Sequence, residues 1–286
     1  MSLTSTRRLV AQASADGGAV AAFNVITLDH AESIVAGASR AGAGALLQLS
    51  ENAIRFHGSP WPILAACREL ADAASVPIGI HLDHLEDVGL VRGILARAGE
   101  FGIGSLMFDA SRLDYSENVR ATRGIAEEAQ AAGLWVEAEL GAIGGKEGAH
   151  APGVRTNPDE ARSFVEQTGV DGLAVAVGSS HAMLERSAVI DVALVGRLAT
   201  SVSVPLVLHG SSGIADDMIR QAVEAGIRKV NVGTALNIAS TAALRASLAA
   251  APDVIDPRKF SRGARDATVA LVAQLCRVIS FARLGA

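Results

Sequence analysis

The amino-acid sequence predicts an α/β fold, a single (β/α)8 barrel followed by a helical extension at the C-terminal end. Three observations predict it: short apolar runs alternate with amphipathic stretches, no Pro/Ser-rich linker divides the chain, and 286 residues suit one such barrel. Parallel strands need crossover connections, which helices supply, so the alternation indicates a parallel sheet. We expect residues 1–286 to form one domain, with an open doubly wound sheet as the alternative architecture.

The expected strands are apolar, and a stretch with apolar residues at helical spacing follows each of them. One helix start is marked by Asn157, which can cap it, and by Pro158 at its first position. The tail after residue 252 contains the sequence DPRKF at 256–260, near its start. It should end in a helix packed outside the barrel. The eight expected strands are residues 19–25, 44–50, 77–84, 105–111, 134–141, 172–178, 205–210 and 229–234.

Composition excludes several classes of protein. The net charge is −5 and no Lys/Arg run is present, so nucleic acid is not an expected partner, whereas a small anionic substrate is allowed. No apolar stretch reaches about 18 residues, and the first residues do not form a secretory signal, so no membrane association is expected. Cys67 and Cys276 are too few for a disulfide framework, which indicates buried thiols and a cytoplasmic location.

Polar residues gather at the carboxyl ends of the expected strands, where barrels of this type form their active sites. A single histidine at such an end is more often a satisfied core residue, but three on separate strands can converge as the open three-ligand site of catalytic zinc. His30, His57, His81 and His150 are interpreted as structural or supporting. The residues at this rim are His84, Asp109, Glu139, His181, His209, Asn231 and Thr234.

Carboxylates stand near the same rim. Asp83 precedes His84, and Asp109 and Glu139 end neighbouring runs, so acids are present for proton transfer and for a second or alternate metal position. The spacing leaves their division of roles open.

Two turns of small residues predict a phosphate site. HGSSGIADD at 209–217 and NVGTALN at 231–237 each read as a strand end, a small-residue turn and a helix start. Backbone N–H groups can approach an anion at such turns, and the helix dipole favours its charge. Barrels often hold phosphate at the loops after strands seven and eight.

Nearly the whole chain resembles the class II fructose-bisphosphate and tagatose-bisphosphate aldolases, which are TIM barrels. The matching blocks occur in order along the sequence. They are AFNV at 22–25, HLDHLED at 81–87, LMFDAS at 106–111, VEAELGAIGGKE at 136–147, TNPDEA at 156–161, TGVDGLAVAVGSSH at 168–181, PLVLHGSSG at 205–213, KVNVGT at 229–234 and DPRKF at 256–260.

The resemblance implies a function: reversible cleavage of a ketose 1,6-bisphosphate to dihydroxyacetone phosphate and glyceraldehyde 3-phosphate through a zinc-stabilised enediolate. Fructose 1,6-bisphosphate, the substrate in glycolysis, is favoured, with tagatose 1,6-bisphosphate next. The zinc ligands implied are His84, His181 and His209, with Glu139 as a nearby or alternate ligand. Asp109 would serve a second divalent or a monovalent cation.

Other residues take their implied roles from the same resemblance. Asp83 would move the proton of the C4 hydroxyl, and Glu147 would move the proton at the enediolate carbon. A tail arginine, Arg262 or Arg265, would reach a neighbouring subunit's pocket, which implies a homodimer or homotetramer. Ser50 would lie on the far side of the pocket. The dihydroxyacetone-phosphate end would lie among Gly210, Ser212, Asn231 and Thr234.

The sequence departs from the family at Ala182, where glycine is common, and at Ala235, where an acid is common. Arg155 stands where many relatives have an aromatic residue. These changes leave the identity of the sugar open.

Two alternative functions are an aldolase for 5-dehydro-2-deoxyphosphogluconate, as in inositol catabolism, and a phosphosugar-binding barrel without catalysis. The second would require a missing acid or ligand, whereas Asp83, Glu147 and the three histidines are all present. A Schiff-base mechanism is disfavoured, because Lys229 should open its strand at the wrong end and the other lysines lie in a loop or the tail.

Overall fold

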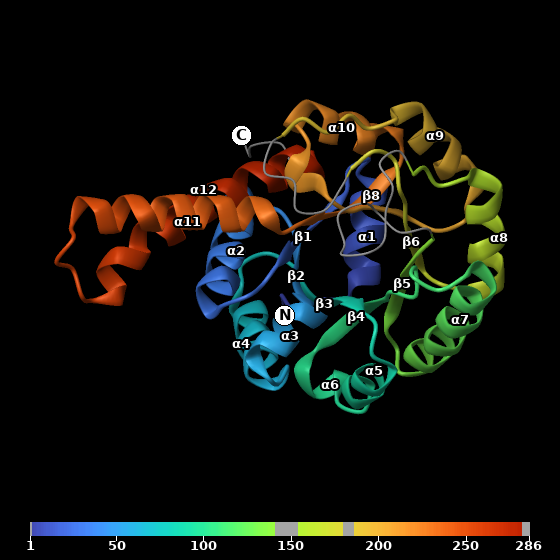
Figure 1. Cartoon of the computed structure of the whole chain (residues 1–286), viewed down its shortest axis with the longest axis horizontal. Helices are drawn as coiled ribbons and strands as arrows, with labels where there is room; N and C mark the ends of the chain where they lie inside the picture. The colour runs from blue at the N-terminus through green and yellow to red at the C-terminus, as the bar shows by residue number, and fades with distance from the viewer. Residues whose placement is uncertain (1, 141–153, 180–185, 282–286) are drawn as a thin grey trace.

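The computed structural model describes residues 2–140, 154–179 and 186–281 and has the predicted architecture. Eight parallel strands form a closed barrel in the order β1 to β8, and β8 pairs with β1. Figure 1 shows the helices as a ring around these strands. The predicted (β/α)8 barrel is therefore confirmed.

Each observed strand overlaps one predicted run, although β6 and β7 are shorter than expected and β8 begins earlier. The strands are β1 (Val20–Asn24), β2 (Ala45–Ser50), β3 (Ile78–Leu85), β4 (Ile103–Phe108), β5 (Trp135–Glu139), β6 (Gly172–Ala174), β7 (Leu206–Leu208) and β8 (Ile227–Val232).

The helices lie where the apolar residues recur at helical spacing. Asn157 accepts hydrogen bonds from the N–H groups of Asp159 and Glu160, which confirms the predicted cap. The helices are α1 (Thr6–Ala15), α2 (Leu28–Ala41), α3 (Glu51–His57), α4 (Trp61–Ala73), α5 (Val88–Leu95), α6 (Ala98–Phe101), α7 (Tyr115–Ala131), α8 (Pro158–Thr168), α9 (Val192–Ser201), α10 (Asp216–Ala225), α11 (Thr234–Ala250) and α12 (Pro257–Ser280), and a 3₁₀ turn spans Ser211–Gly213.

The barrel interior changes character along its axis. At the amino ends of the strands, Leu9 and Val10 of α1 pack against Val20, Ala22 and Leu46 and close that end. Toward the carboxyl ends, polar side chains replace apolar ones on the inward-facing positions. The polar residues are thus concentrated at the open end of the barrel.

Helix α12 packs outside the barrel against α2, as the tail was predicted to do. Helix α11 and the start of α12 project beyond the barrel wall (Figure 1). Cys67 and Cys276 are buried and unpaired, as predicted, and burial raises the pKa of each thiol to about 12. No helix in the described ranges is long and apolar enough to cross a membrane.

The close packing of α12 on α2 predicts a stability effect at Gly37. A Cβ at Gly37 would lie 2.6 Å from the Cβ of Val272, so we expect Gly37→Ala to lower the free energy of unfolding by about 1–3 kcal/mol. Gly93 in α5 is exposed and has nothing within 4 Å of an added Cβ, so Gly93→Ala should raise it by about 0.5–1 kcal/mol. Urea unfolding of both variants tests this. Equal changes in the free energy of unfolding would contradict the close contact between α2 and α12.

Candidate active site

A pocket of about 640 Å³ opens at the carboxyl ends of the strands. Residues of β1, β2, β3 and β8, of α3 and the start of α11, and of the loops after β1, β3, β4 and β7 line it. Several residues predicted from sequence meet there: Ser50, Asp83, His84, Gly210, Ser212, Asn231 and Thr234.

A bulge at the end of β3 brings two adjacent residues into this pocket. In a regular strand, Asp83 and His84 would point to opposite faces. The pairing with β4 shifts register between Leu82 and Leu85, and the backbone of His84 is left-handed, with φ of 49°. This conformation is costly for a residue other than glycine, and it turns both side chains toward the same cavity.

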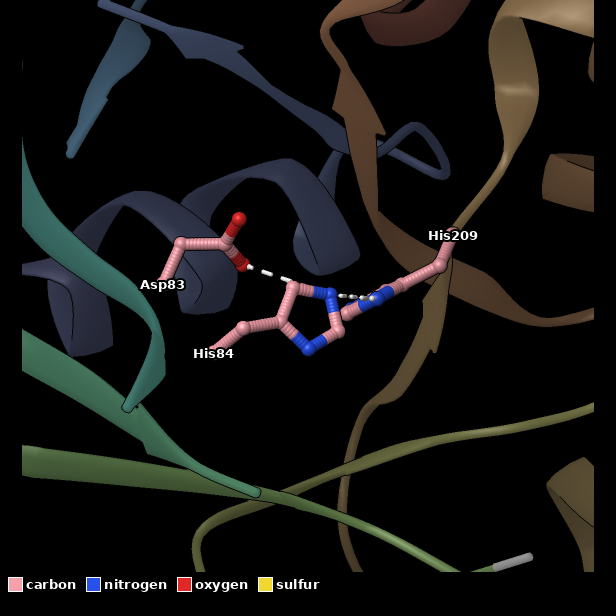
Figure 2. A group of neighbouring side chains, drawn as sticks. All are labelled: Asp83, His84 and His209. Atoms are coloured by element: carbon pink, nitrogen blue, oxygen red, sulfur yellow. Dashed lines mark hydrogen bonds and ion pairs between the residues drawn. The ribbon is translucent and has the colours of Figure 1, made fainter. Parts of the chain in front are cut away.

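The imidazole of His84 lines the pocket and faces that of His209, which is fully buried beside it. His84 Nε2 and His209 Nδ1 lie 3.1 Å apart, and the ring planes make an angle of 86°. Asp83 lies on the same side, with Oδ1 3.9 Å from His84 Nε2. Figure 2 shows the two rings meeting edge to face, with the carboxylate of Asp83 alongside.

Carboxylates on the outer sides of the rings set their tautomers. His84 Nδ1 donates to Asp109 Oδ2 at 2.7 Å, and His209 Nε2 donates to Glu137 Oε1 at 2.8 Å. Ser111 also donates to Asp109, through its hydroxyl at 2.6 Å, which holds that carboxylate in place. The acceptor nitrogen of each ring therefore points toward the other ring, the arrangement expected of two ligands of one cation.

Two groups of side chains fit a metal ion. Asp83, His84 and His209 have potential ligand atoms within 4.8 Å of one another, and so do His84, Asp109 and Glu139. Imidazole and carboxylate donors suit zinc and other divalent transition metals. The predicted ligand and the predicted acid that complete the set, His181 and Glu147, lie outside the described residues.

Asp83 sits between two amide side chains. Its Oδ2 accepts from Asn24 Nδ2 at 3.3 Å, and its Oδ1 accepts from Asn231 Nδ2 at 3.4 Å. Gln48 Nε2 in turn donates to Asn24 Oδ1 at 3.2 Å. These contacts fix the orientation of a 4% exposed carboxylate at the edge of the pocket, where it can exchange a proton with a bound molecule.

Four polar residues of this site were missed as candidates: Asn24, Gln48, Glu137 and Lys229. Lys229 was expected to open its strand at the end away from the active site. This expectation is wrong, because β8 begins at Ile227 and the ammonium of Lys229 lies buried beneath the pocket, where it donates to Glu137 at 2.8 Å. Gln48, Glu137 and Lys229 each interrupt an apolar strand at an inward-facing position. That alternation was the available signal.

One of the two turns predicted to bind phosphate lies beside a helix N-terminus at the pocket. The loop after β7 turns at Gly210, with φ of 68°, and Ser212 Oγ accepts from the N–H of Ala235 in the first turn of α11 at 3.0 Å. Gly233 and Thr234 line the pocket where α11 begins, and a helix N-terminus favours an anion. The other predicted helix start differs, since α10 begins only at Asp216, which does not line the pocket.

The remaining candidates lie away from the pocket. Arg265 pairs with Glu32 at 2.7 Å and Asp29 at 3.3 Å on α2. Arg262 is exposed on α12, and neither arginine lines the pocket of its own chain. His30, His57 and His81 do not line it either, while His150 lies outside the described residues.

Burial of His81 predicts a pH dependence of stability. Burial and the charge of Lys229 hold the pKa of His81 well below its usual value of 6.5, so the unfolded chain binds the proton first and stability is lost as pH falls below about 6.5. We expect metal-free His81→Gln protein to lose less stability between about pH 7 and 5 than the parent chain. Melting temperatures at both pH values test this, with His57→Gln as the exposed control; equal acid sensitivity would contradict it.

The chain is similar to known proteins over nearly its whole length. The family model described as fructose-bisphosphate aldolase class-II matches residues 4–283. The YdjI aldolase of Escherichia coli K12 is 29% identical over 97% of each chain, with a TM-score of 0.81. A putative fructose-1,6-biphosphate aldolase of Coccidioides immitis is 28% identical over 97% of this chain and 96% of that chain, with a TM-score of 0.86. A Campylobacter jejuni fructose-bisphosphate aldolase, at 19% identity, 97% and 95% coverage and a TM-score of 0.82, adds likeness of fold alone.

Proposed function

Because the chain belongs to the class II fructose-bisphosphate aldolase family, we propose that it cleaves a ketose 1,6-bisphosphate in a zinc-dependent reaction, with fructose 1,6-bisphosphate as the first candidate and tagatose 1,6-bisphosphate as the second. The products are dihydroxyacetone phosphate and glyceraldehyde 3-phosphate. The observation that carries the proposal is the meeting of two imidazole acceptor nitrogens, 3.1 Å apart, beside the carboxylate of Asp83.

The metal would be held by His84 and His209 together with the predicted His181. Glu139 and Asp109 would offer a second or alternate cation position that shares His84. When bound, the zinc ion supplies a positive charge that stabilises the negative charge left by cleavage of the C3–C4 bond.

The side chains of the chain itself carry the proton transfers. Asp83 accepts the proton of the C4 hydroxyl during cleavage and returns it during condensation, while Asn24 and Asn231 keep its carboxylate oriented. Glu147 is proposed to move the proton at carbon 3. Two separate groups are needed because the two protons move at different atoms.

The phosphate of the dihydroxyacetone-phosphate half would lie against Gly210, Ser212 and the start of α11 at Thr234. Ser50, which accepts from Ala53 N–H at 3.2 Å at the start of α3, lines the pocket beyond Asp83 and is assigned to the distal half. The distal half also contains Arg55, which pairs with Glu51.

That pairing supports a second candidate substrate. Among the described residues that line the pocket, Arg55 and Arg112 are the cationic side chains, and they already pair with Glu51 and Glu86. A substrate without a second phosphate, such as 5-dehydro-2-deoxyphosphogluconate, would therefore suit the distal half. A panel of fructose, tagatose and sorbose bisphosphates and this keto acid, compared by kcat/KM, separates the candidates, and no turnover of any would favour a binding barrel without catalysis.

We also propose a homodimer or homotetramer in the cytoplasm. Within α11 only Leu236 is buried, while Ile238 is 42% and Leu248 40% exposed. A second copy would cover this apolar surface. Since Arg265 is paired with α2, Arg262 is the better candidate to reach a neighbouring pocket.

Removal of metal should abolish activity. We expect a strong chelator to inactivate the protein and added zinc or cobalt to restore it, because the charge on the product carbanion is otherwise unsupported. His209→Ala should bind less zinc than the parent chain, and His57→Gln should bind as much. Full activity in metal-free protein, or a covalent adduct trapped by borohydride, would contradict the proposal.

Replacement of Asp83 should separate proton transfer from metal binding. We expect Asp83→Asn to lower kcat by about 10²–10⁴-fold, because the side chain keeps its shape but loses the basic oxygen. Steady-state kinetics together with metal analysis test this. Loss of bound zinc in the variant would reassign Asp83 to the metal site.

A further inference from the structure

A fully buried ion pair crosses the barrel beneath the pocket. Lys229 Nζ of β8 donates to Glu137 Oε2 of β5 at 2.8 Å, and both side chains are 0% exposed. Neither residue lines the pocket. The pair therefore cannot touch a substrate, and any effect on the reaction must pass through its neighbours.

Each oxygen of Glu137 has a different partner. Oε2 accepts from Lys229, while Oε1 accepts from Nε2 of His209 at 2.8 Å. A carboxylate at this place requires the proton of His209 to be on Nε2, which leaves Nδ1 as the nitrogen directed at His84. The rotation and the tautomer of His209 thus depend on a carboxylate that the lysine holds in place.

Lys229 also orients the amide that faces Asp83. Its Nζ donates to Asn231 Oδ1 at 2.7 Å and to Gln48 Oε1 at 3.4 Å, in addition to Glu137. These three acceptors use the three N–H groups of an ammonium. Because Asn231 accepts through its oxygen, its Nδ2 is turned to the opposite side, 3.4 Å from Asp83 Oδ1 and 3.0 Å from Nε2 of His209. The lysine is thus held as a donor, not as a nucleophile.

Packing alone does not require this pair. The neighbouring interior is filled by an apolar cluster that includes Met107, Trp135 and Val207. Burying two charges costs solvation energy, and apolar replacements of buried pairs are often neutral or stabilising. A charged pair at this level is therefore better explained by what it holds in place.

We propose that Glu137 and Lys229 are positioning residues, which fix the ring of His209 for the metal and the amide of Asn231 for Asp83. The inference rests on the proposed function, in that a metal is taken to bind between His84 and His209. It follows that both charges affect metal affinity, and that Lys229 in addition affects turnover.

Metal affinity and spectroscopy test the first part. Glu137→Gln should weaken zinc binding by about 10–100-fold in competition with a chromogenic chelator, and should shift the visible spectrum of the cobalt-loaded protein. Ser105→Ala is the matched control, because it removes a buried hydrogen bond to His81 in the same barrel without touching His209. Both variants should lose thermal stability, but only Glu137→Gln should lose metal affinity.

Kinetics test the second part. Lys229→Met should lower kcat more than it raises KM, because Asp83 loses the oriented amide of Asn231, and it should also weaken zinc binding. If both variants bind zinc as the parent chain does, with an unshifted cobalt spectrum and an unchanged ratio of kcat to KM, the pair is only structural and the proposal is wrong.

A measurement on the unaltered zinc-loaded protein keeps the proposal testable if the variants do not fold. Nitrogen NMR of ¹⁵N-histidine-labelled protein should find the proton of His209 on Nε2, and a proton on Nδ1 would overturn the proposal. A different result would overturn the proposed function itself, namely a parent chain that binds no stoichiometric zinc. A parent chain that binds zinc while Glu137→Gln is unaffected removes only the positioning role.

Discussion

The left-handed backbone of His84 is the constraint on which the rest of the site depends. An extended conformation at this residue would direct its ring into the helix-facing core, away from His209 and Asp109. The bulge at the end of β3 instead places Asp83 and His84 on the same cavity, so that one strand supplies both a buried carboxylate and an imidazole to the pocket. A strained turn of this kind persists only where the surrounding structure determines it.

The interior of the barrel has two levels along its axis, and the lower one supports the site. The lower level is apolar and closed by α1, which anchors the strands without polar groups that would need partners. The upper level is a connected set of hydrogen bonds, in which Lys229 donates to both Glu137 and Asn231. Such a network is costly if incomplete, so the removal of one member should affect several others.

Helix α11 joins the site to the surface of the molecule. Its first turn lies at the pocket and contacts the loop after β7 through Ser212, whereas its remaining length projects with apolar side chains exposed. One helix thus belongs both to the lining of the pocket and to the exposed apolar surface. Helix α12 packs against both α11 and α2. The contact with α2 is close because Gly37 has no side chain at that point.

The sequence alone determined the eight strands, their order and the rim on which His84, His209 and Asp83 would lie, because alternation and strand ends are local properties. It did not determine the partners of these residues. Glu137 and Lys229 are 92 positions apart, and only closure of the barrel in its register brings them together. Nor could it show that His84 departs from strand geometry or that Arg265 is held by α2. Distances across a barrel and departures from regular backbone depend on the packing of the whole chain, which no local pattern encodes.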